Sequence, residues 1–363
     1  MEPIRLGLLM AEPQLAAQRW RNVLELALDD LRASGRLHRE VTFVERNPEG
    51  LPNGTSAAVI AAFGELRDEG VLGVLGPANG DNCISLQPHI DRAELATVGL
   101  CATMRFPSEW CFSVPWGSCP EDALLVASWI VANGHRRLAV ITDDLWHSAE
   151  YLEYLDLAAD RHGLTIVHRE QLPATVRDAA QATDEQLERA AEAVERARAA
   201  TPDVLVHMGP LSLAAVAHCV TDQGWDIPKI ANNAFAAAQR PERAALFEGW
   251  VGTTSWHDDN ELLANLLERH AKQFGEPAGP DFAASVYDGA RVLFEGLALA
   301  PILNRPGLRA GLERVRGLRS SLGGPENVLS FGPWDHRALK SSSMMVLRRI
   351  EGGRSVMEPL PRP

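Results

Sequence analysis

The chain has 363 residues, of which 46% are hydrophobic and 23% charged, as is typical of a soluble globular protein. This length suits two domains of common size, with a cleft between them. The formal net charge of −13 argues against nucleic acid or an anionic membrane surface as a partner, because both would repel the chain. No apolar run reaches the roughly 20 residues of a membrane-spanning helix, so the chain is not predicted to be membrane-embedded.

The first part of the chain alternates short apolar runs with amphipathic segments. The run IRLGLLM (4–10) precedes residues 14–35, whose leucines, alanines and Trp20 recur at helical spacing. Strands that alternate with helices of this length predict a parallel sheet covered on both faces. The other strands predicted here are 40–46, 71–76 and 95–100, and the other helices are 55–70 and 81–94.

A second series of the same kind follows the segment CFSVPWGSCPEDA. It predicts a second α/β domain, because strands and helices alternate as before. The predicted helices are 123–134, 148–163, 182–200 and 212–224, and the predicted strands are 137–142, 164–170, 203–209 and 228–233.

The last hundred or so residues are predicted to pack on, and add strands to, the sheets formed by earlier parts of the chain. Strand 249–256 is followed by helices 261–275, 281–300 and 307–323, and only residues 327–353 read as strands again. Helices without a matching sheet must pack on an existing one, so the chain is expected to cross between the domains three times and form a hinge. The predicted lobes are residues 1–117 with 255–331, and residues 118–254 with 332–363.

Two loops stand out as candidate ligand sites. The segments VLGVLGPANG and DVLVHMGPLS each end a buried strand in Gly-Pro and lead into a helix. Gly-Pro is also a common turn, but open α/β sheets bind ligands at the carboxyl ends of their parallel strands. Neither loop has the G-x-G-x-x-G or Gly-Lys-Ser/Thr pattern, so no nucleotide cofactor is predicted.

Catalytic and metal sites are not predicted. The segments WGSCP and TTSWHDD carry serine or threonine, in the second case near a histidine, but the chain has no G-x-S-x-G elbow. His257, Asp258 and Asp259 are consecutive in the sequence, and three such residues rarely converge on one ion. We therefore expect neither an enzyme nor a bound metal.

The five cysteines are Cys83, Cys101, Cys111, Cys119 and Cys219, and they contain no C-x-x-C pair. Reduced thiols are predicted, and a bridge between Cys111 and Cys119 stays open for an oxidising compartment. The first residues, MEPIRLGLLMAEPQ, lack the features of a signal peptide. The sequence as it stands therefore favours the cytoplasm, and an extracytoplasmic location follows if the N-terminus has been trimmed.

Several segments follow one another in a characteristic order: GVLGVLGP, LATVGLCATM, CFSVPWGSCPEDA, HRRLAVITDDLWHSAEY and LSFGPWDHRALKSSSMMVLRRIEGG. Across nearly the whole chain this order resembles the leucine-binding family of type I periplasmic solute-binding proteins, which serve branched-chain amino acid ABC transporters. The terminal F-G-x-W-D is the most distinctive element. The resemblance implies an α/β fold of two Rossmann-like lobes with parallel sheets, joined by a three-strand hinge, that close on a small ligand as a Venus flytrap does.

The resemblance also implies which residues of the first lobe hold the polar head of the ligand. Backbone N–H groups at a helix start and the Thr103 hydroxyl can bind a carboxylate or carbonyl oxygen without a formal positive charge. Cys101 contributes its carbonyl, and a helix N-cap is the alternative role for Thr103. The residues expected here are Ala78, Asn79, Gly80, Asp81, Cys101, Ala102 and Thr103.

In the second lobe the matching segments are TDDLWHSAE, MGPLS and NNAFA. The family usually places an aromatic residue in the first of these, and Trp146 or His147 takes that place by stacking on the ligand. We favour Trp146, and a half-buried core position is its alternative. The expected residues are Trp146, His147, Pro210, Leu211 and Asn233, and Trp256 completes the set.

The sequence departs from the family in IANNAFA. Relatives that bind amino acids carry a carboxylate near here, whereas residues 233–235 are Asn, Ala and Phe. An unpaired buried ammonium costs on the order of several kcal/mol. Unless Asp81, Asp143 or Asp144 substitutes, we expect a carboxylate, amide or aromatic ligand and not an α-amino acid.

The resulting prediction is a non-enzymatic solute-binding protein that serves an ABC-type importer through its permease. The alternative is a cytosolic sensor that acts on a regulatory protein, similar to the amide-sensing regulators of the same superfamily. A hydrolase is the third hypothesis, and turnover of the bound ligand would distinguish it.

Overall fold

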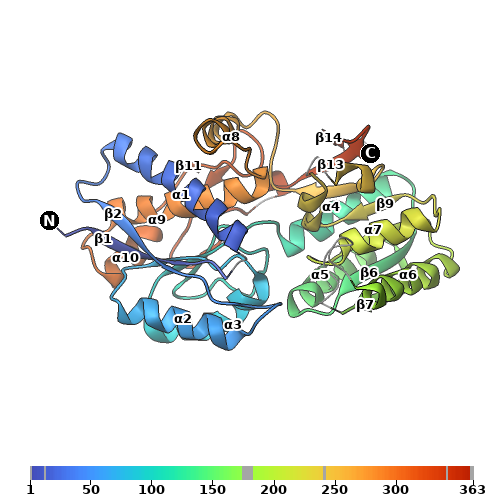
Figure 1. The fold of residues 1–363 in the computed structure, drawn as a ribbon, viewed down its shortest axis with the longest axis horizontal. Coiled ribbons are helices and arrows are strands. Elements are labelled where there is room, and N and C mark those ends of the chain that lie inside the picture. Colours follow the sequence, from blue (N-terminus) through green and yellow to red (C-terminus); the bar gives the residue numbers. More distant parts are fainter. Residues whose placement is uncertain (1, 12–13, 174–182, 240–242, 341, 360–363) are drawn as a thin grey trace. The chain divides into compact units, whose positions relative to one another are not determined.

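The computed structural model describes residues 2–11, 14–173, 183–239, 243–340 and 342–359. Its contacts divide the chain into two compact units: Met1–Trp116 with Trp256–Met344 (unit 1), and Gly117–Ser255 with Met345–Pro363 (unit 2). The chain therefore passes from one unit to the other three times (Figure 1). The predicted α/β class with a parallel sheet in each lobe is confirmed.

Unit 1 is built on a parallel sheet that has five strands within the described residues, in the order β2-β1-β3-β4-β5. In Figure 1, α1 and α9 lie on one face of this sheet, and α2 and α3 lie on the other. The strands are β1 (Ile4–Leu9), β2 (Val41–Arg46), β3 (Val74–Leu75), β4 (Thr97–Gly99) and β5 (Cys111–Ser113). The helices are α1 (Gln14–Ser34), α2 (Ser56–Asp68), α3 (Gly80–Ala93), α8 (Glu261–Phe274), α9 (Pro280–Leu299) and α10 (Arg305–Leu312).

The late helices of the chain complete the core of unit 1. Helix α9 packs on α1, β3 and β4, as expected for helices that lack a sheet of their own. The Trp20 side chain on α1 is fully buried, and its ring lies 6.1 Å from that of Phe282 on α9. Burial of such large rings supplies much of the stability of a lobe.

The end of the chain differs from the prediction in two places. Residues 332–344 belong to unit 1 and not to the second lobe, because Ser113 N donates to His336 O at 2.8 Å and the His336 ring stacks on Phe112 at 3.9 Å. The helix predicted over 307–323 ends at Leu312. Gly317 at φ 62° turns the chain into β11 (Leu318–Arg319), which pairs with β12 (Val328–Leu329).

Unit 2 contains a sheet that has seven strands within the described residues, in the order β14-β13-β10-β9-β8-β6-β7. The strands β6 to β10 are parallel, and the last two strands of the chain add an antiparallel edge. The strands are β6 (Arg137–Asp143), β7 (Thr165–Leu172), β8 (Val204–His207), β9 (Lys229–Ala231), β10 (Val251–Thr254), β13 (Val346–Glu351) and β14 (Arg354–Met357). The helices are α4 (Cys119–Ala132), α5 (Trp146–His162), α6 (Asp184–Ala199) and α7 (Leu213–Asp222), with 3-10 turns η1 (Asn233–Gln239) and η2 (Ala244–Phe247) in unit 2 and η3 (Ser342–Met344) in unit 1.

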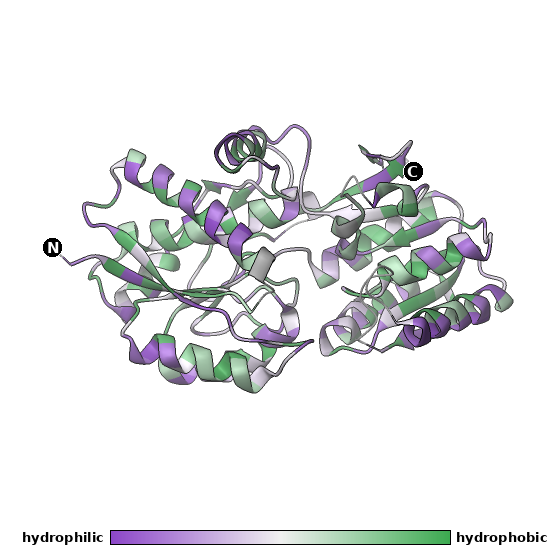
Figure 2. Cartoon of the chain, viewed as in Figure 1, coloured by the Kyte–Doolittle hydropathy of each residue, from purple (hydrophilic) through white to green (hydrophobic). Residues whose placement is uncertain are grey.

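Side chains along the strands of unit 2 alternate between the two faces of the sheet. Ala139 and Ile141 of β6 and Leu205 of β8 pack into one core with α6 and α7. Figure 2 shows hydrophobic strands inside and hydrophilic outer faces on the helices, most clearly on α6. A capping box of Thr183 and Gln186 begins α6. Residue 182, with which the predicted helix began, lies outside the described residues.

All five cysteines are buried free thiols. Cys111 lies on β5 in unit 1 and Cys119 begins α4 in unit 2, and the bridge considered between them is not formed. None of the described helices combines the length and the apolarity that crossing a membrane requires.

Candidate functional site

The loop after β3 is shaped by its close approach to β1. Gly76 has φ 96°, and a Cβ there would lie 2.1 Å from the carbonyl oxygen of Leu9, so only glycine fits. Asn79 then begins α3, because its Oδ1 accepts a hydrogen bond from Asn82 N at 3.0 Å. Asn82 also binds the chain at Leu51, through the backbone N–H at 2.9 Å and the carbonyl at 3.1 Å. The sequence analysis did not single out Asn82.

The loop after β4 lies against this first loop. Leu100 N donates to the carbonyl of Pro77 at 3.0 Å, and the Cys83 thiol donates to the same oxygen at 3.3 Å. Ser113 Oγ donates to Cys101 O at 3.4 Å. Thr103 Oγ1 accepts from the N–H of Arg105 at 3.1 Å, so this hydroxyl closes a turn and does not cap a helix.

The structure thus brings the expected residues of unit 1 together at the carboxyl edge of its sheet. Gly80 and Asp81 are buried in the first turn of α3, and Cys101, Ala102 and Thr103 are buried in the second loop. Ala78 and Asn79 are partly exposed. Since the N-terminus of a helix attracts anions, this edge suits the oxygen-bearing end of a small molecule.

In unit 2, Asp143 ties the loop after β8 to the end of β6. Its fully buried carboxylate accepts from Leu211 N at 2.8 Å and from Ser212 N at 3.0 Å. Burial raises the pKa of Asp143 to about 6, and these hydrogen bonds oppose the rise. A Cβ on Gly209 would lie 2.3 Å from Asp143 Oδ2, so the loop requires glycine there. Pro210 and Leu211 are partly exposed in this loop.

The two aromatic candidates of α5 differ in exposure. Trp146, the first residue of the helix, is 63% exposed, whereas His147 is 8% exposed. The His147 ring lies 5.0 Å from that of Tyr151, and burial lowers the pKa of His147 to about 4, so its imidazole is neutral at neutral pH. Trp146 therefore offers the open aromatic surface.

Two asparagines follow β9. Asn232 is fully buried, its backbone N–H donates to His207 O at 3.0 Å, and its Nδ2 has no hydrogen-bond partner among the described residues. Asn233 Oδ1 accepts from the Tyr151 hydroxyl at 2.9 Å. Because buried donors are rarely left unpaired, Asn232 marks a place for a water molecule or a solute oxygen.

A buried carboxyl group on α4 completes the polar groups of this region, and the sequence analysis missed it. Asp122 is fully buried, and its Oδ2 accepts from Ser118 N and from the Tyr151 hydroxyl, each at 3.1 Å. Thr253 on β10 donates to Oδ1. Burial raises the pKa of Asp122 to about 7. Its only sequence signal was an acidic residue in the first turn of a helix, which is common for electrostatic reasons.

Trp256 and Phe235 belong to different units. Trp256 belongs to unit 1, where its backbone pairs with that of Gly323. Phe235 is buried in the core of unit 2, and its ring lies 6.4 Å from that of Phe247. The described residues contain no group of three or more side chains suited to a metal ion.

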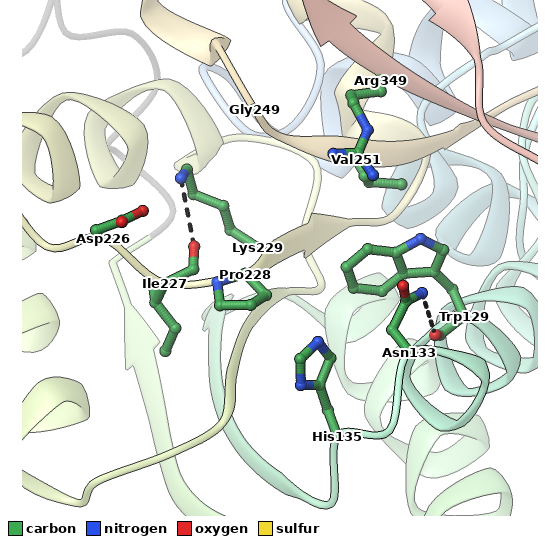
Figure 3. Close-up of a pocket in the computed structure, with 10 residues that line it drawn as sticks. All are labelled: Trp129, Asn133, His135, Asp226, Ile227, Pro228, Lys229, Gly249, Val251 and Arg349. Carbon is green, nitrogen blue, oxygen red and sulfur yellow. Dashed lines mark hydrogen bonds between the residues drawn. The ribbon is translucent and has the colours of Figure 1, made fainter.

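A pocket of about 470 Å³ in unit 2 lies at the opposite, amino-terminal edge of the sheet (Figure 3). In it Lys229 Nζ donates to Ile227 O at 3.3 Å, and Arg349 pairs with Glu358 at 2.7 Å. Glu358 thus offsets the charge of Arg349, Asp226 acts electrostatically on Lys229, and the pocket specifies no ligand class. The lining residues are Trp129, Asn133, His135, Asp226, Ile227, Pro228, Lys229, Gly249, Val251 and Arg349, none of which was expected to bind a ligand.

A family model described as periplasmic binding protein matches residues 10–354. A periplasmic binding protein type 1 from Bordetella pertussis Tohama I is 16% identical over 99% of this chain and 100% of its own, with a TM-score of 0.81. An ABC transporter substrate-binding protein from Desulfitobacterium hafniense, solved in complex with Leu, is 18% identical over 98% of this chain and 100% of its own, with a TM-score of 0.77. A possible leucine/isoleucine/valine-binding protein from Rhodopirellula baltica SH 1 is 18% identical over 99% of this chain and 97% of its own, with a TM-score of 0.80. No curated protein matches the sequence significantly.

Proposed function

The chain belongs to the periplasmic binding protein family, and we propose that it binds a small organic solute, without changing it chemically, as the substrate-binding component of an ABC-type importer. One observation carries this proposal. In each unit, loops that follow neighbouring parallel strands are joined at the carboxyl edge of the sheet, through Pro77 in unit 1 and Asp143 in unit 2. Open α/β sheets bind small molecules at this edge.

The proposed roles follow from the chemistry of each loop. Residues 78–81 and 101–103 bind the oxygen-bearing end of the solute with backbone N–H groups and the Thr103 hydroxyl. Trp146 covers its apolar body, because the ring is exposed at the start of α5. His147, Pro210, Leu211 and Asn233 provide further contacts, and Trp256 has the weakest support. Closure of the lobes on the solute stays a prediction. Small-angle X-ray scattering, measured with and without solute, tests it.

The proposed solute carries a carboxylate, an amide or an aromatic ring and has no ammonium group. Two of the carboxyl groups near the loops of unit 2 already have partners, since Asp143 accepts from two backbone N–H groups and Asp122 from three donors. Asp144 is exposed to solvent, where it would pair an ammonium only weakly. Near the loops of unit 2, the ammonium of an α-amino acid would therefore be left without a free buried counter-charge, and Asp81 at the start of α3 in unit 1 is the remaining carboxyl group that could pair with it.

Titration calorimetry with leucine, isocaproate and isocaproamide tests this proposal, because the three share one branched side chain. We expect isocaproate or isocaproamide to bind more tightly than leucine, and tighter binding of leucine would contradict the solute class. At 100 times its Kd a solute should stabilise the protein by about 2.7 kcal/mol. Mass spectrometry of the recovered solute should show no turnover, whereas a product would indicate an enzyme.

The alternative function, a sensor that acts on a regulatory protein, would use the same solute site. Uptake of labelled isocaproate by cells with and without the gene separates the two functions. Loss of uptake supports the importer. Unchanged uptake with altered gene expression supports the sensor.

A further inference from the structure

Trp334 is 96% exposed, more than any other large hydrophobic side chain among the described residues, and the proposed solute site does not use it. It lies in unit 1, within the terminal F-G-x-W-D motif that the sequence analysis singled out. An indole that stays in water adds almost nothing to the stability of the fold, because hydrophobic stabilisation requires burial. Tryptophan is also a residue type that anchors protein–protein interfaces. Its exposure here therefore points to a binding role.

The turn that carries Trp334 is closed by backbone hydrogen bonds in both directions. Gly332 N donates to Asp335 O at 2.8 Å, and Asp335 N donates to Gly332 O at 3.3 Å. Pro333 occupies the second position of the turn, where its restricted φ is favoured. Phe331, directly before the turn, is buried and fixes its base. The indole is thus presented by an ordered backbone, which lowers the entropy cost of binding a partner.

Two antiparallel segments of unit 1 lie beside this turn and carry exposed arginines. Phe331 N donates to Val315 O at 3.1 Å, and further along β11 pairs with β12. A Cβ on Gly332 would lie 4.0 Å from Nη2 of Arg316, so the guanidinium of Arg316 lies beside the turn. The exposed side chains of these segments and the turn form the Trp334 patch, which consists of Arg314, Arg316, Arg319, Val328 and Trp334.

The three arginines of the Trp334 patch have no carboxylate partner within the described part of the chain. Arg316 instead donates to the carbonyl oxygens of Glu313 and Val315, both at 2.8 Å, which fixes its position and leaves its charge in place. Arg309 on the neighbouring helix α10 differs, because it forms ion pairs with two glutamates. The positive charge of the patch is therefore available to a partner.

The acidic side chains close to the patch in sequence do not cancel this charge. Asp335 in the turn pairs with Lys340 at 2.8 Å, and Glu313 pairs with Arg309 at 3.1 Å. Glu326, in the loop between β11 and β12, is exposed and offsets one of the three arginines. The patch thus has a net positive charge on a chain whose formal net charge is −13.

We propose that the Trp334 patch is a docking surface for a partner protein that presents an acidic segment beside an apolar pocket. The pocket takes the indole of Trp334, and the acidic side chains pair with the arginines, Arg316 first among them because it lies beside the turn. Tryptophan and arginine are the residue types that most often dominate the binding energy of interfaces.

The overall charge of the chain favours a protein as the partner. Nucleic acid and anionic membranes extend far beyond the patch and meet the repulsion of the whole chain. A short acidic segment meets mainly the local positive charge, because salt screens charges beyond about 8 Å. A second copy of the chain would bring the same net charge of −13 and be repelled as well. The importer and the sensor both need a protein partner, so the inference does not depend on the solute.

Photo-crosslinking of the full-length protein, in the cells from which the gene comes, identifies the partner. The protein carries p-benzoylphenylalanine in place of Trp334, and mass spectrometry sequences the crosslinked peptide. We expect a peptide of another protein with several acidic residues close to the crosslink. The control carries the same amino acid in place of Leu157, which is 64% exposed on α5 in unit 2, and it should not yield this peptide. The proposal is overturned if position 334 gives no crosslink, or crosslinks only a second copy or a segment without acidic residues.

A synthetic peptide of the crosslinked sequence then tests the chemistry of docking by calorimetry with the purified protein. We expect Trp334→Ala to weaken binding about tenfold or more, and Arg316→Glu to weaken it more at low salt than at high salt. Arg354→Glu makes the same charge change at an exposed arginine of unit 2, and it should bind the peptide as the parent does. Equal affinities of the parent and Trp334→Ala contradict the docking role. Binding to phosphatidylglycerol vesicles that is lost in Trp334→Ala would assign the patch to a membrane surface and overturn the proposal.

Discussion

The candidate loops of the two units are held in different ways. In unit 1 the contacts come mainly from backbone groups and asparagine amides: Gly76 lies against Leu9, Leu100 binds Pro77 and Asn82 binds Leu51. In unit 2 they come from buried groups that titrate, with Asp143 holding the loop after β8 and Asp122 holding Tyr151. Because amides and backbone groups do not titrate, we expect pH to act on the contacts of Asp143 and Asp122 in unit 2 and not on the contacts named here in unit 1.

The largest effect is expected from Asp143→Ala, which leaves the N–H groups of Leu211 and Ser212 without their buried acceptor. We expect a loss of about 3 to 4 kcal/mol in the free energy of unfolding, measured by equilibrium denaturation in urea. Asp144→Ala is the control, because this exposed neighbour should change stability by less than about 0.5 kcal/mol. Equal losses in the two variants would show that Asp143 does not hold the loop.

The corresponding test in unit 1 is Gly76→Ala. The new Cβ would meet the carbonyl oxygen of Leu9 at a positive φ, so we expect a loss of about 2 to 3 kcal/mol in the free energy of unfolding. Gly70→Ala is the matched control, since Gly70 has φ 75° and nothing within 4 Å of the new atom. It should cost about 1 kcal/mol. The close approach to β1 is refuted if both variants lose the same stability.

A smaller effect is expected on the pH dependence of the free energy of unfolding, and it arises from Asp122 in unit 2. In the folded state the pKa of Asp122 is about 7, above its usual 3.8, so between these values the folded protein binds the proton more tightly than the unfolded chain does. The contribution of Asp122 is therefore fully present below about pH 4 and is lost as pH rises through 7. From about pH 5 to 8 the stability of the parent relative to Asp122→Asn should fall by about 2 kcal/mol.

Urea denaturation of the parent and of Asp122→Asn from about pH 5 to 8 checks whether the stability difference falls with rising pH, as expected. His147 and His207, whose pKa values are lowered to about 4 and about 3, give the opposite slope between those values and their usual 6.5. Both proteins contain these histidines, so their effect cancels in the difference. A difference that does not change with pH would mean that Asp122 does not titrate in this range.

The smallest expected effect is on solute affinity. Trp146→Ala should lose roughly 1 to 2 kcal/mol of binding free energy by calorimetry, and the melting temperature without solute should stay unchanged because the side chain is 63% exposed. Trp334→Ala is the control, a tryptophan 96% exposed in unit 1 that should change neither quantity. If Trp146→Ala mainly lowers the melting temperature, Trp146 is a scaffold residue.

Local patterns in the sequence were enough to predict the elements and the fold class. Apolar runs such as residues 4–10 became parallel strands, because strands that are covered on both faces need no polar alternation. The helix predicted over 307–323 was too long, because α10 ends at Leu312 although the helical pattern continues, and Leu318–Arg319 pair as a strand after the turn at Gly317. The sequence pattern of residues 307–323 alone does not show that Leu318–Arg319 pair with Val328–Leu329.

The side-chain contacts of the candidate site could be predicted only in part. The loops 78–81 and 101–103 were predicted from the resemblance to the leucine-binding family, and the structure places both after parallel strands, while their role in binding stays a prediction. Asp122, Tyr151 and Thr253 come from α4, α5 and β10, and nothing in the local sequence indicates that three such distant residues share hydrogen bonds. Such contacts depend on how the helices pack on the sheet.

Hydrogen–deuterium exchange with and without the tightest binder among leucine, isocaproate and isocaproamide tests the central claim most directly. The account predicts slower exchange in peptides that cover residues 76–83, 100–105 and 208–213, and unchanged exchange around Trp129, Lys229 and Arg349, which line the pocket in Figure 3. Protection confined to that pocket, or no protection in any of the three loop peptides, would contradict it.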